Sequence, residues 1–265
     1  MSEIIIMKSL LELIEKGEDL ALITITKAQG STPRGIGAQM IVLGDGSIIG
    51  TVGGGILEKR IIQLGVEAIE KGNSQSIPLD LKAEDIGMVC GGQIEIFIQI
   101  YKSRPKLLIV GGGHVSFALY NLASILDFDI VIFEDREEFL NPERFPLAKE
   151  LVLGPIDKSL REHGISEDSY IVIVTRGHKY DEEALEAVID SKAKYIGVMG
   201  SKKKVLNMFD NIKSRGISEE SLSKVYSPIG LDIGNSSPEE IGISILAEIL
   251  AVKNNRKVQH MRIER

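Results

Sequence analysis

The chain has 265 residues, which at ~150 residues per domain is enough for about two domains, and its 43% hydrophobic and 26% charged residues are typical of globular proteins. These values exclude a disulfide-stapled miniprotein and a wholly disordered chain. Lys and Arg total 31 against 38 Asp and Glu, so the net charge is −7, and Trp is absent. An acidic chain with few stacking side chains argues against a nucleic acid partner.

The cellular compartment follows from the single cysteine and the first residues. Cys90 has no second cysteine with which to form an internal disulfide. The start of the chain lacks the basic region, apolar core and cleavage site of a signal peptide. No apolar run reaches the ~18 residues of a membrane span. We therefore expect a cytoplasmic protein that does not enter a membrane.

The first hundred residues predict a compact α+β domain, which we place at residues 1–101. Its glycines stand at the ends of apolar runs and mark turns, such as Gly44-Asp45-Gly46 between two short strands. Helical spacing of apolar residues and β-branched alternation distinguish the elements. Helices are predicted over residues 4–16 and 56–71, and strands over residues 20–26, 39–43, 47–52 and 94–101.

A different pattern follows the polar joint at residues 102–105. Near-continuous apolar runs alternate with helix-length segments, which is typical of strands buried on both faces of a parallel sheet. Strands are predicted over residues 106–110, 129–134, 150–153, 170–175, 194–199 and 224–227. Ser237-Pro238-Glu239-Glu240 predicts the start of the last helix. The fold class is α/β, with a Rossmann-like doubly wound domain over residues 105–252 and a polar tail over residues 253–265.

A glycine-rich turn follows the first strand of this second domain. Gly111 and Gly113 lie between the strand and an apolar helix, a context in which bare backbone and helix N–H groups bind a pyrophosphate, and His114 follows directly. Ser116 stands at the third usual glycine position. Glu134-Asp135 ends the next strand, close to the ~20 residues at which an acid binds a ribose hydroxyl. The alternative is a tight turn with acids in solvent.

The strands that follow bring more polar residues to the same edge. Arg176 can clamp an anion, and His178 can titrate near neutrality. His114 and His178 follow strands that should be neighbours, and with Asp181 they offer a weak alternative as metal ligands, although no dedicated ligand pattern is present. Gly200, Ser201 and Lys202 begin a further helix. This segment is either an anion site or a solvated basic turn.

The first domain contributes two glycine-rich loops and the only thiol. Arg34 lies in the loop over residues 30–38, and Gly53, Gly54 and Gly55 precede the second helix, so either loop can form an anion nest. Cys90 precedes Gly91-Gly92. Cys90 is therefore either a nucleophilic or sulfur-carrying thiol or a small packing residue.

Taken together, the motifs resemble the XdhC/CoxI family, accessory proteins that mature xanthine dehydrogenase and related molybdenum hydroxylases. The resemblance spans nearly the whole chain. It rests on Gly30-Ser31-Thr32-Pro33-Arg34, Val52-Gly53-Gly54-Gly55, Cys90-Gly91-Gly92, Gly111-Gly112-Gly113-His114-Val115, Glu134-Asp135-Arg136, Arg144-Phe145-Pro146, Thr175-Arg176-Gly177-His178, Gly200-Ser201-Lys202 and Pro228-Ile229-Gly230-Leu231-Asp232. One departure is Glu134, where the family usually has a second Asp.

The resemblance implies a homodimer that binds molybdenum cofactor, either as molybdopterin or in its nucleotide-extended form. It also implies help with sulfuration by a cysteine desulfurase and delivery to apo-xanthine dehydrogenase or a related hydroxylase. We expect Cys90 and His178 to act chemically, and the cofactor to be held between the domains. The predicted binding residues are Arg34, Gly53, Gly54, Gly55, Gly111, Gly113, His114, Glu134, Asp135, Arg176, Gly200, Ser201 and Lys202.

Two other functions fit parts of the pattern. The glycine turn with an acidic second strand is also typical of an NAD(P)-dependent oxidoreductase, with His178 or His114 as proton donor to a small carbonyl substrate. A dinucleotide-sensing regulator ranks last, because the sequence has no recognisable DNA-binding module and the wrong net charge.

Overall fold

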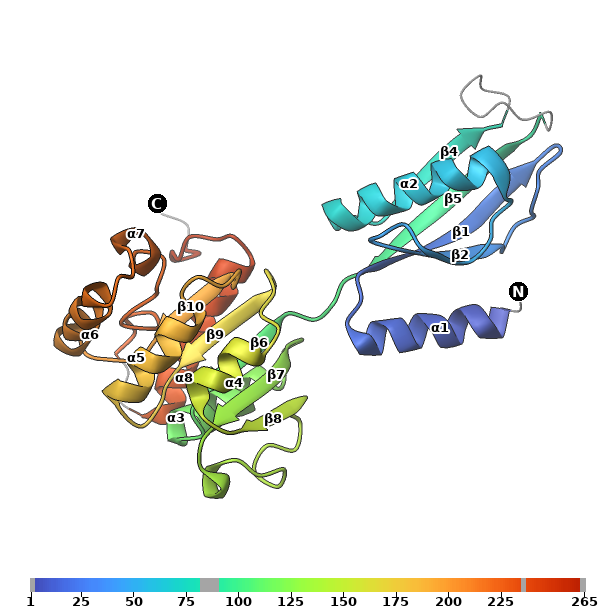
Figure 1. Ribbon diagram of the computed structural model, residues 1–265. Helices are drawn as coiled ribbons and strands as arrows, with labels where there is room; N and C mark the ends of the chain where they lie inside the picture. Colours follow the sequence, from blue (N-terminus) through green and yellow to red (C-terminus); the bar gives the residue numbers. More distant parts are fainter. Residues whose placement is uncertain (1–2, 82–90, 235–236, 263–265) are drawn as a thin grey trace. The chain divides into compact units, whose positions relative to one another are not determined.

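The computed structural model describes residues 3–81, 91–234 and 237–262. Within them the chain forms two compact units that divide between Ser103 and Arg104 (Figure 1). Among the described helices, none is long and apolar enough to cross a membrane.

The N-terminal unit is a five-stranded antiparallel sheet with strand order β3-β2-β1-β5-β4. One helix covers each face. The elements are α1 (Glu3–Lys16), β1 (Leu20–Gln29), β2 (Gln39–Leu43), β3 (Ile48–Gly50), α2 (Gly55–Lys71), β4 (Gln75–Asp80) and β5 (Gln93–Tyr101).

Strand alternation decides which helix covers which face. Ile94, Ile96 and Ile98 of β5 are buried in one cluster with Leu57 and Ile61 of α2. A smaller cluster on the other side joins α1 to β1 and β2. Because successive strand residues point to opposite faces, the residues between those isoleucines face away from α2.

The sequence analysis missed β4 and shortened β1. Pro78 argues against a central strand, but β4 lies at the edge of the sheet, where a missing N–H is tolerated. β1 continues to Gln29 because a bulge between Ile25 and Lys27 lets it keep pairing with β5. The predicted turn at Gly44-Asp45-Gly46 is confirmed, with Leu43 N–H donating to the Ser47 carbonyl.

The C-terminal unit is a five-stranded parallel sheet with strand order β10-β9-β6-β7-β8. This is the strand order of a Rossmann fold. The elements are β6 (Lys106–Val110), α3 (His114–Ala123), β7 (Asp129–Glu134), the 3-10 turn η1 (Glu137–Phe139), β8 (Glu150–Leu153), α4 (Ile156–Glu162), β9 (Ser169–Ile173), α5 (His178–Val188), β10 (Tyr195–Val198), α6 (Lys202–Ser214), α7 (Glu219–Leu222) and α8 (Pro238–Lys253).

Helices cover both faces of this sheet, which confirms the doubly wound prediction. Leu107 and Ile109 of β6 pack with α3 and α8 on one face. Leu108 and Val110 pack with α4, α5 and α6 on the other. Strands buried on both faces explain the near-continuous apolar runs in the sequence.

The predicted sixth strand over residues 224–227 was wrong. Only Tyr226 pairs there, through an isolated parallel bridge to Gly197. The Ser227 hydroxyl donates to the Val198 carbonyl, and Pro228 has no N–H with which to continue a ladder. The chain therefore leaves the sheet after one residue.

The start of α8 confirms its prediction. The Glu240 N–H donates to the Ser237 hydroxyl at 3.2 Å, and the Ser237 N–H donates to the Glu240 carboxylate at 3.1 Å. This reciprocal pair is a capping box, which local sequence alone specifies.

Candidate functional site

The strand order of the C-terminal sheet reverses between β6 and β9. These strands are hydrogen-bonded neighbours, and the helices that follow them, α3 and α5, lie on opposite faces of the sheet. The loops that leave their carboxyl ends therefore diverge at this topological switch point, which is where open α/β sheets bind ligands. The predicted neighbourhood of the strands that precede His114 and His178 is confirmed.

The two predicted glycines of the turn after β6 have different structural roles. Gly111 has φ +110°, and a Cβ there would lie 2.7 Å from the Val174 carbonyl oxygen. It thus allows β6 and β9 to approach at the switch point. Gly113 is the N-cap of α3, with φ −72°, and a Cβ there meets nothing within 4 Å. Gly113 is the position in this turn that is open to a ligand.

Glu134 binds the same turn from the end of β7. Its carboxylate accepts the Gly112 N–H at 2.7 Å and the Arg136 Nε–H at 3.0 Å, and its side chain is 3% exposed. Burial by itself would raise the pKa of Glu134. Hydrogen bonds from Arg136, Asp135 and Gly112 outweigh burial and lower this pKa to about 2. Glu134, one of the two acids predicted to bind a ribose hydroxyl, therefore already accepts hydrogen bonds from Gly112 and Arg136.

Asp135 and Arg176 form an ion pair between the loops that follow β7 and β9. The Arg176 guanidinium donates to both carboxylate oxygens, at 3.1 Å and 2.9 Å, and stacks on the Tyr180 ring at 4.2 Å from its centroid. Because β6 lies between β7 and β9 in the sheet, this pair bridges the two loops that flank the glycine turn. An anionic ligand of Arg176 has to compete with Asp135.

Three helices begin at this edge of the sheet. His114, His178 and Lys202 are the first residues of α3, α5 and α6. The N-cap residues before them, Gly113, Gly177 and Ser201, make no side-chain capping bond in the structure described. Lys202 is exposed in the first turn of α6, and Gly200 precedes it. Uncapped helix N-termini present N–H groups and positive dipole ends to anions.

Asp181, in the first turn of α5, is hydrogen-bonded to the loop after β9. It is buried, and its carboxylate accepts the Thr175 hydroxyl at 2.6 Å. Burial raises the pKa of Asp181, against the effect of its bonds from Thr175. Among residues 3–81, 91–234 and 237–262, no group of three His, Cys, Asp or Glu side chains is placed to hold a metal ion.

Arg144 is a site residue to which the sequence analysis assigned no role. Its guanidinium donates to the Gly113 carbonyl at 3.2 Å and lies over the rings of Phe117 and Phe145, at 5.1 Å and 5.2 Å from their centroids. This places a second arginine beside the first turn of α3. The available signal was the Arg144-Phe145-Pro146 motif.

In the N-terminal unit, the two predicted glycine loops meet. A Cβ on Gly53 would lie 3.0 Å from the Pro33 Cβ, and Arg34 and Thr51 line one hollow of about 250 Å³. Arg34 is exposed. The structure therefore brings Arg34 and the glycine loop before α2 to one surface of this unit.

Three successive N–H groups of that glycine loop, from Val52 to Gly54, already have acceptors. The Glu58 carboxylate of α2 accepts the Val52 N–H at 3.3 Å and the Gly54 N–H at 3.4 Å. It also accepts the hydroxyl of Thr51, whose oxygen takes the Gly53 N–H at 3.3 Å. An anion at this loop would compete with Glu58.

Cys90 lies outside the described residues. Gly91 and Gly92, which follow it, line a hollow of about 250 Å³ together with Gln29, Gly30 and Asp80. Gly92 is required by packing, because a Cβ there would lie 2.5 Å from the Ser31 carbonyl oxygen. The predicted site residues are thus divided between the units, with Arg34 and the Gly53–Gly55 loop in the N-terminal one.

The C-terminal unit is a Rossmann domain, because its doubly wound parallel sheet has a topological switch point, a glycine turn after the first strand and an acid at the end of the second strand. A family model described as the XdhC Rossmann domain matches residues 107–249, and the model of the XdhC and CoxI family matches residues 13–80. The chain belongs to the XdhC and CoxI family.

Three curated relatives align with more than nine-tenths of the chain. It is 35% identical over 248 residues to the uncharacterized protein YqeB of Escherichia coli (strain K12), covering 92% of this chain and 45% of that protein. The chain therefore spans less than half of that relative. It is 22% identical to a probable xanthine dehydrogenase subunit of Bacillus subtilis (strain 168), covering 91% and 95% of the two chains. It is 21% identical to the molybdenum cofactor insertion chaperone PaoD of Escherichia coli (strain K12), covering 94% and 88%.

One solved structure shares the fold over nearly the whole chain. It is described as a xanthine dehydrogenase from Bacillus halodurans and is 23% identical, with a TM-score of 0.54 and coverage of 94% and 96% of the two chains. At this identity the likeness supports the fold alone.

Proposed function

We propose that this protein binds molybdenum cofactor and delivers it to a xanthine dehydrogenase-type molybdenum hydroxylase. The observation that carries the proposal is the edge of the Rossmann sheet at which α3, α5 and α6 begin, with Arg144 bonded to the N-cap of α3 and Arg176 just before α5. Molybdenum cofactor is a pterin that carries phosphate, and this edge supplies the backbone N–H groups and guanidinium groups that bind phosphate. The functions for which PaoD and the Bacillus subtilis relative are named support the same role.

The remaining residues complete the proposed site. His114 and His178, at the first turns of their helices, are exposed. Lys202 adds a cation at the first turn of α6. Arg34 and the Gly53–Gly55 loop are the proposed cofactor contacts within the N-terminal unit. The proposal includes a cytoplasmic homodimer, a cysteine desulfurase as sulfur donor and an apo-hydroxylase as recipient.

The test is equilibrium binding of molybdenum cofactor to the purified full chain under anaerobic conditions. We expect tight binding to the wild type and at least a tenfold loss in Arg176→Ala, because a charge-assisted bidentate contact is removed. Arg161→Ala is the matched control, since Arg161 is exposed on α4 away from the predicted site residues. Equal affinity of all three proteins would remove Arg176 from the site.

NAD(H) and NADP(H) are measured in parallel, because the strand order and the glycine turn favour a dinucleotide as the second candidate ligand. The Glu134 carboxylate is bound by Gly112 and Arg136 and is not presented to a ribose. Dinucleotide binding without affinity for molybdenum cofactor would overturn the proposal in favour of an oxidoreductase.

Cys90 is the proposed thiol contact to molybdenum or transient carrier of sulfur. We expect Cys90→Ala to lose most of the hydroxylase activity that the wild-type gene restores in a strain lacking the protein, with cofactor content of the hydroxylase measured alongside. Cys90→Ser, which keeps side-chain size without a thiol, separates chemistry from packing. Full activity with Cys90→Ala would exclude the role.

A further inference from the structure

The helix α1 leaves a row of large apolar side chains exposed. Ile6 and Leu10 attach the helix to its sheet and are buried. On a neighbouring side of the helix, four apolar residues are between 38% and 68% exposed: Ile4, Met7, Leu11 and Ile14. Exposed apolar side chains that lie together, and are not scattered singly, mark surfaces that bind another protein.

The spacing of these four residues, the α1 stripe, is that of a seam between two helices. They follow one another at intervals of three, four and three residues, which aligns them along one side of the helix. The same intervals separate the two apolar positions of a heptad repeat, whose side chains pack into the gaps of a facing helix. The α1 stripe therefore has the form of one half of a helix pair.

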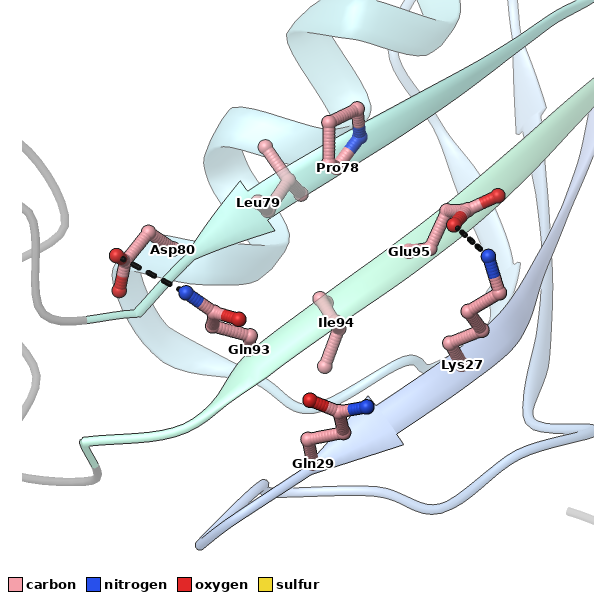
Figure 2. A pocket seen from close by; sticks show the side chains of 8 residues that line it. All are labelled: Lys27, Gln29, Pro78, Leu79, Asp80, Gln93, Ile94 and Glu95. Atoms are coloured by element: carbon pink, nitrogen blue, oxygen red, sulfur yellow. Dashed lines mark hydrogen bonds and ion pairs between the residues drawn. The ribbon is translucent and has the colours of Figure 1, made fainter.

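The sheet does not offer a further apolar surface to this helix along β1. α1 and α2 lie on opposite faces of the sheet (Figure 1). Farther along β1, on the same face as α1, the Lys27 ammonium and the Glu95 carboxylate are paired at 2.7 Å, and the amides of Gln29 and Gln93 form the next row (Figure 2). This polar part of the sheet does not compete for the α1 stripe.

Two charged residues flank the α1 stripe on one side. Lys8 and Glu15 directly follow Met7 and Ile14, so they occupy equivalent positions one heptad apart, and both are exposed. Within the part of the chain that the structure describes, no ion pair joins either of them to another residue. At such flanking positions, charges select the partner and the orientation of a helix pair.

We infer that the α1 stripe packs against the α1 stripe of a second copy of this chain, with the two helices antiparallel. This inference rests on the homodimer of the proposed function. A two-fold axis sets Ile4 opposite Ile14 of the second copy, and Met7 opposite its Leu11. Helical side chains lean toward the N-terminus of their own helix, so Lys8 of each copy reaches Glu15 of the other. The interface is then self-complementary, as two-fold symmetry requires.

The antiparallel orientation uses both flanking charges. A parallel pair would bring Lys8 to Glu3 of the second copy. It would also set Glu15 opposite Leu10, which is buried against its own sheet, and would leave this carboxylate without a cation. The antiparallel pair forms two attractive contacts and leaves neither Lys8 nor Glu15 unpaired.

The inferred interface adjoins the hollow of Arg34. Glu3 and Ile6 of α1 line this hollow together with Arg34 and Thr51. In the antiparallel pair, the last turn of the second copy's α1 lies at the first turn of α1. The second copy therefore borders the proposed cofactor contacts of the N-terminal unit.

Sedimentation velocity of the full chain over a range of protein concentrations tests the interface. We expect the wild type to be a dimer and Leu11→Glu to have an at least about tenfold weaker dimer affinity, because two carboxylates would be buried within the α1 stripe. Ile5→Glu is the matched control, since Ile5 is a 48% exposed residue of α1 outside the stripe. Circular dichroism of each variant checks that it is folded.

Charge reversal tests the orientation of the helices. Lys8→Glu and Glu15→Lys each place like charges side by side and should weaken the dimer. The double variant should restore it, because both contacts become attractive again with the signs exchanged. In a parallel pair, Glu15→Lys would not compensate for Lys8→Glu.

A monomeric wild type, equal dimer affinities of Leu11→Glu and Ile5→Glu, or a double variant that stays as weak as Lys8→Glu would each overturn the inference. Molybdenum cofactor binding by the same proteins separates this result from the proposed function. If the wild type binds the cofactor but is monomeric, or is dimeric through another surface, the α1 interface is wrong and the cofactor role stands. If the wild type does not bind the cofactor, the cofactor role fails and sedimentation alone decides the interface.

Discussion

Gly111→Ala is expected to destabilise the C-terminal unit by more than about 3 kcal/mol, because two costs add at one position. An L-residue at φ +110° is strained, at about 1–2 kcal/mol or more. The new Cβ would also lie 2.7 Å from the Val174 oxygen and 3.1 Å from the Thr175 Cα. All these neighbours are backbone, so relief requires β6 and β9 to separate at the switch point.

Gly113→Ala is the matched control in the same turn. Gly113 has φ −72°, and its added Cβ meets no atom within 4 Å. Because Ala is less favourable than Gly at an N-cap, its replacement should lower the free energy of unfolding by about 0.5–1 kcal/mol, well below the cost at Gly111. Urea unfolding followed by circular dichroism compares the two variants. Similar stabilities of Gly111→Ala and the wild type would contradict the structural role assigned to Gly111.

The folded Gly113→Ala variant also tests the proposed function. If the cofactor phosphate approaches the first turn of α3, a methyl group at residue 113 lies in its path, and affinity for molybdenum cofactor should fall although the variant remains folded. Unchanged affinity would place the phosphate at the N-terminus of α5 or α6 instead.

Glu134→Gln is the second substitution with a large expected effect, a loss of about 3 kcal/mol of stability at neutral pH. The folded pKa of Glu134 is about 2, below its ordinary value of 4.5. A depressed carboxyl pKa stabilises the fold above the unfolded value and loses that effect as pH falls toward the folded value. The contribution is therefore complete above about pH 4.5 and disappears between pH 4.5 and 2.

The measurement is the free energy of unfolding of both proteins across this pH window. We expect the wild-type curve to fall more steeply below pH 4.5 than that of Glu134→Gln, and the two to converge near pH 2. Glu162→Gln, at an exposed position of α4, is the control and should match the wild type. Parallel curves for Glu134→Gln and the wild type would show that Arg136 and Gly112 do not hold the carboxylate in its charged form.

The Asp135–Arg176 ion pair affects the affinity with which the site would bind an anion. Arg176 is held in a bidentate contact at 2.9 Å and 3.1 Å and is therefore oriented before any ligand arrives. The same contact makes Asp135 a competitor for the guanidinium, so a phosphate at this position gains only the difference between the two interactions. Affinity then depends on the helix N-termini as much as on the arginine.

Local sequence determined most of the elements of this protein. The bounds of β2, β6, β7 and β8 agree with those predicted, because hydrophobic periodicity and flanking glycines act within a few residues. The capping box of α8 likewise needs only Ser237 and Glu240. The near-continuous apolar runs then indicated strands that are buried on both faces. Such strands predict a doubly wound sheet, because only a sheet covered on both sides accommodates them.

The tertiary structure determined which of the predicted site residues are already hydrogen-bonded within the protein. Glu134 meets Gly112 across 22 residues of sequence, and Arg144 meets Gly113 across 31. The edge strand β4 was missed by the sequence pattern, because an edge strand with a proline lacks the usual signature and is recognised only by its pairing with β5. Residue type and spacing identify groups that can bind an anion, but pairing between distant segments determines which groups are already bound by the protein and which can contact a ligand.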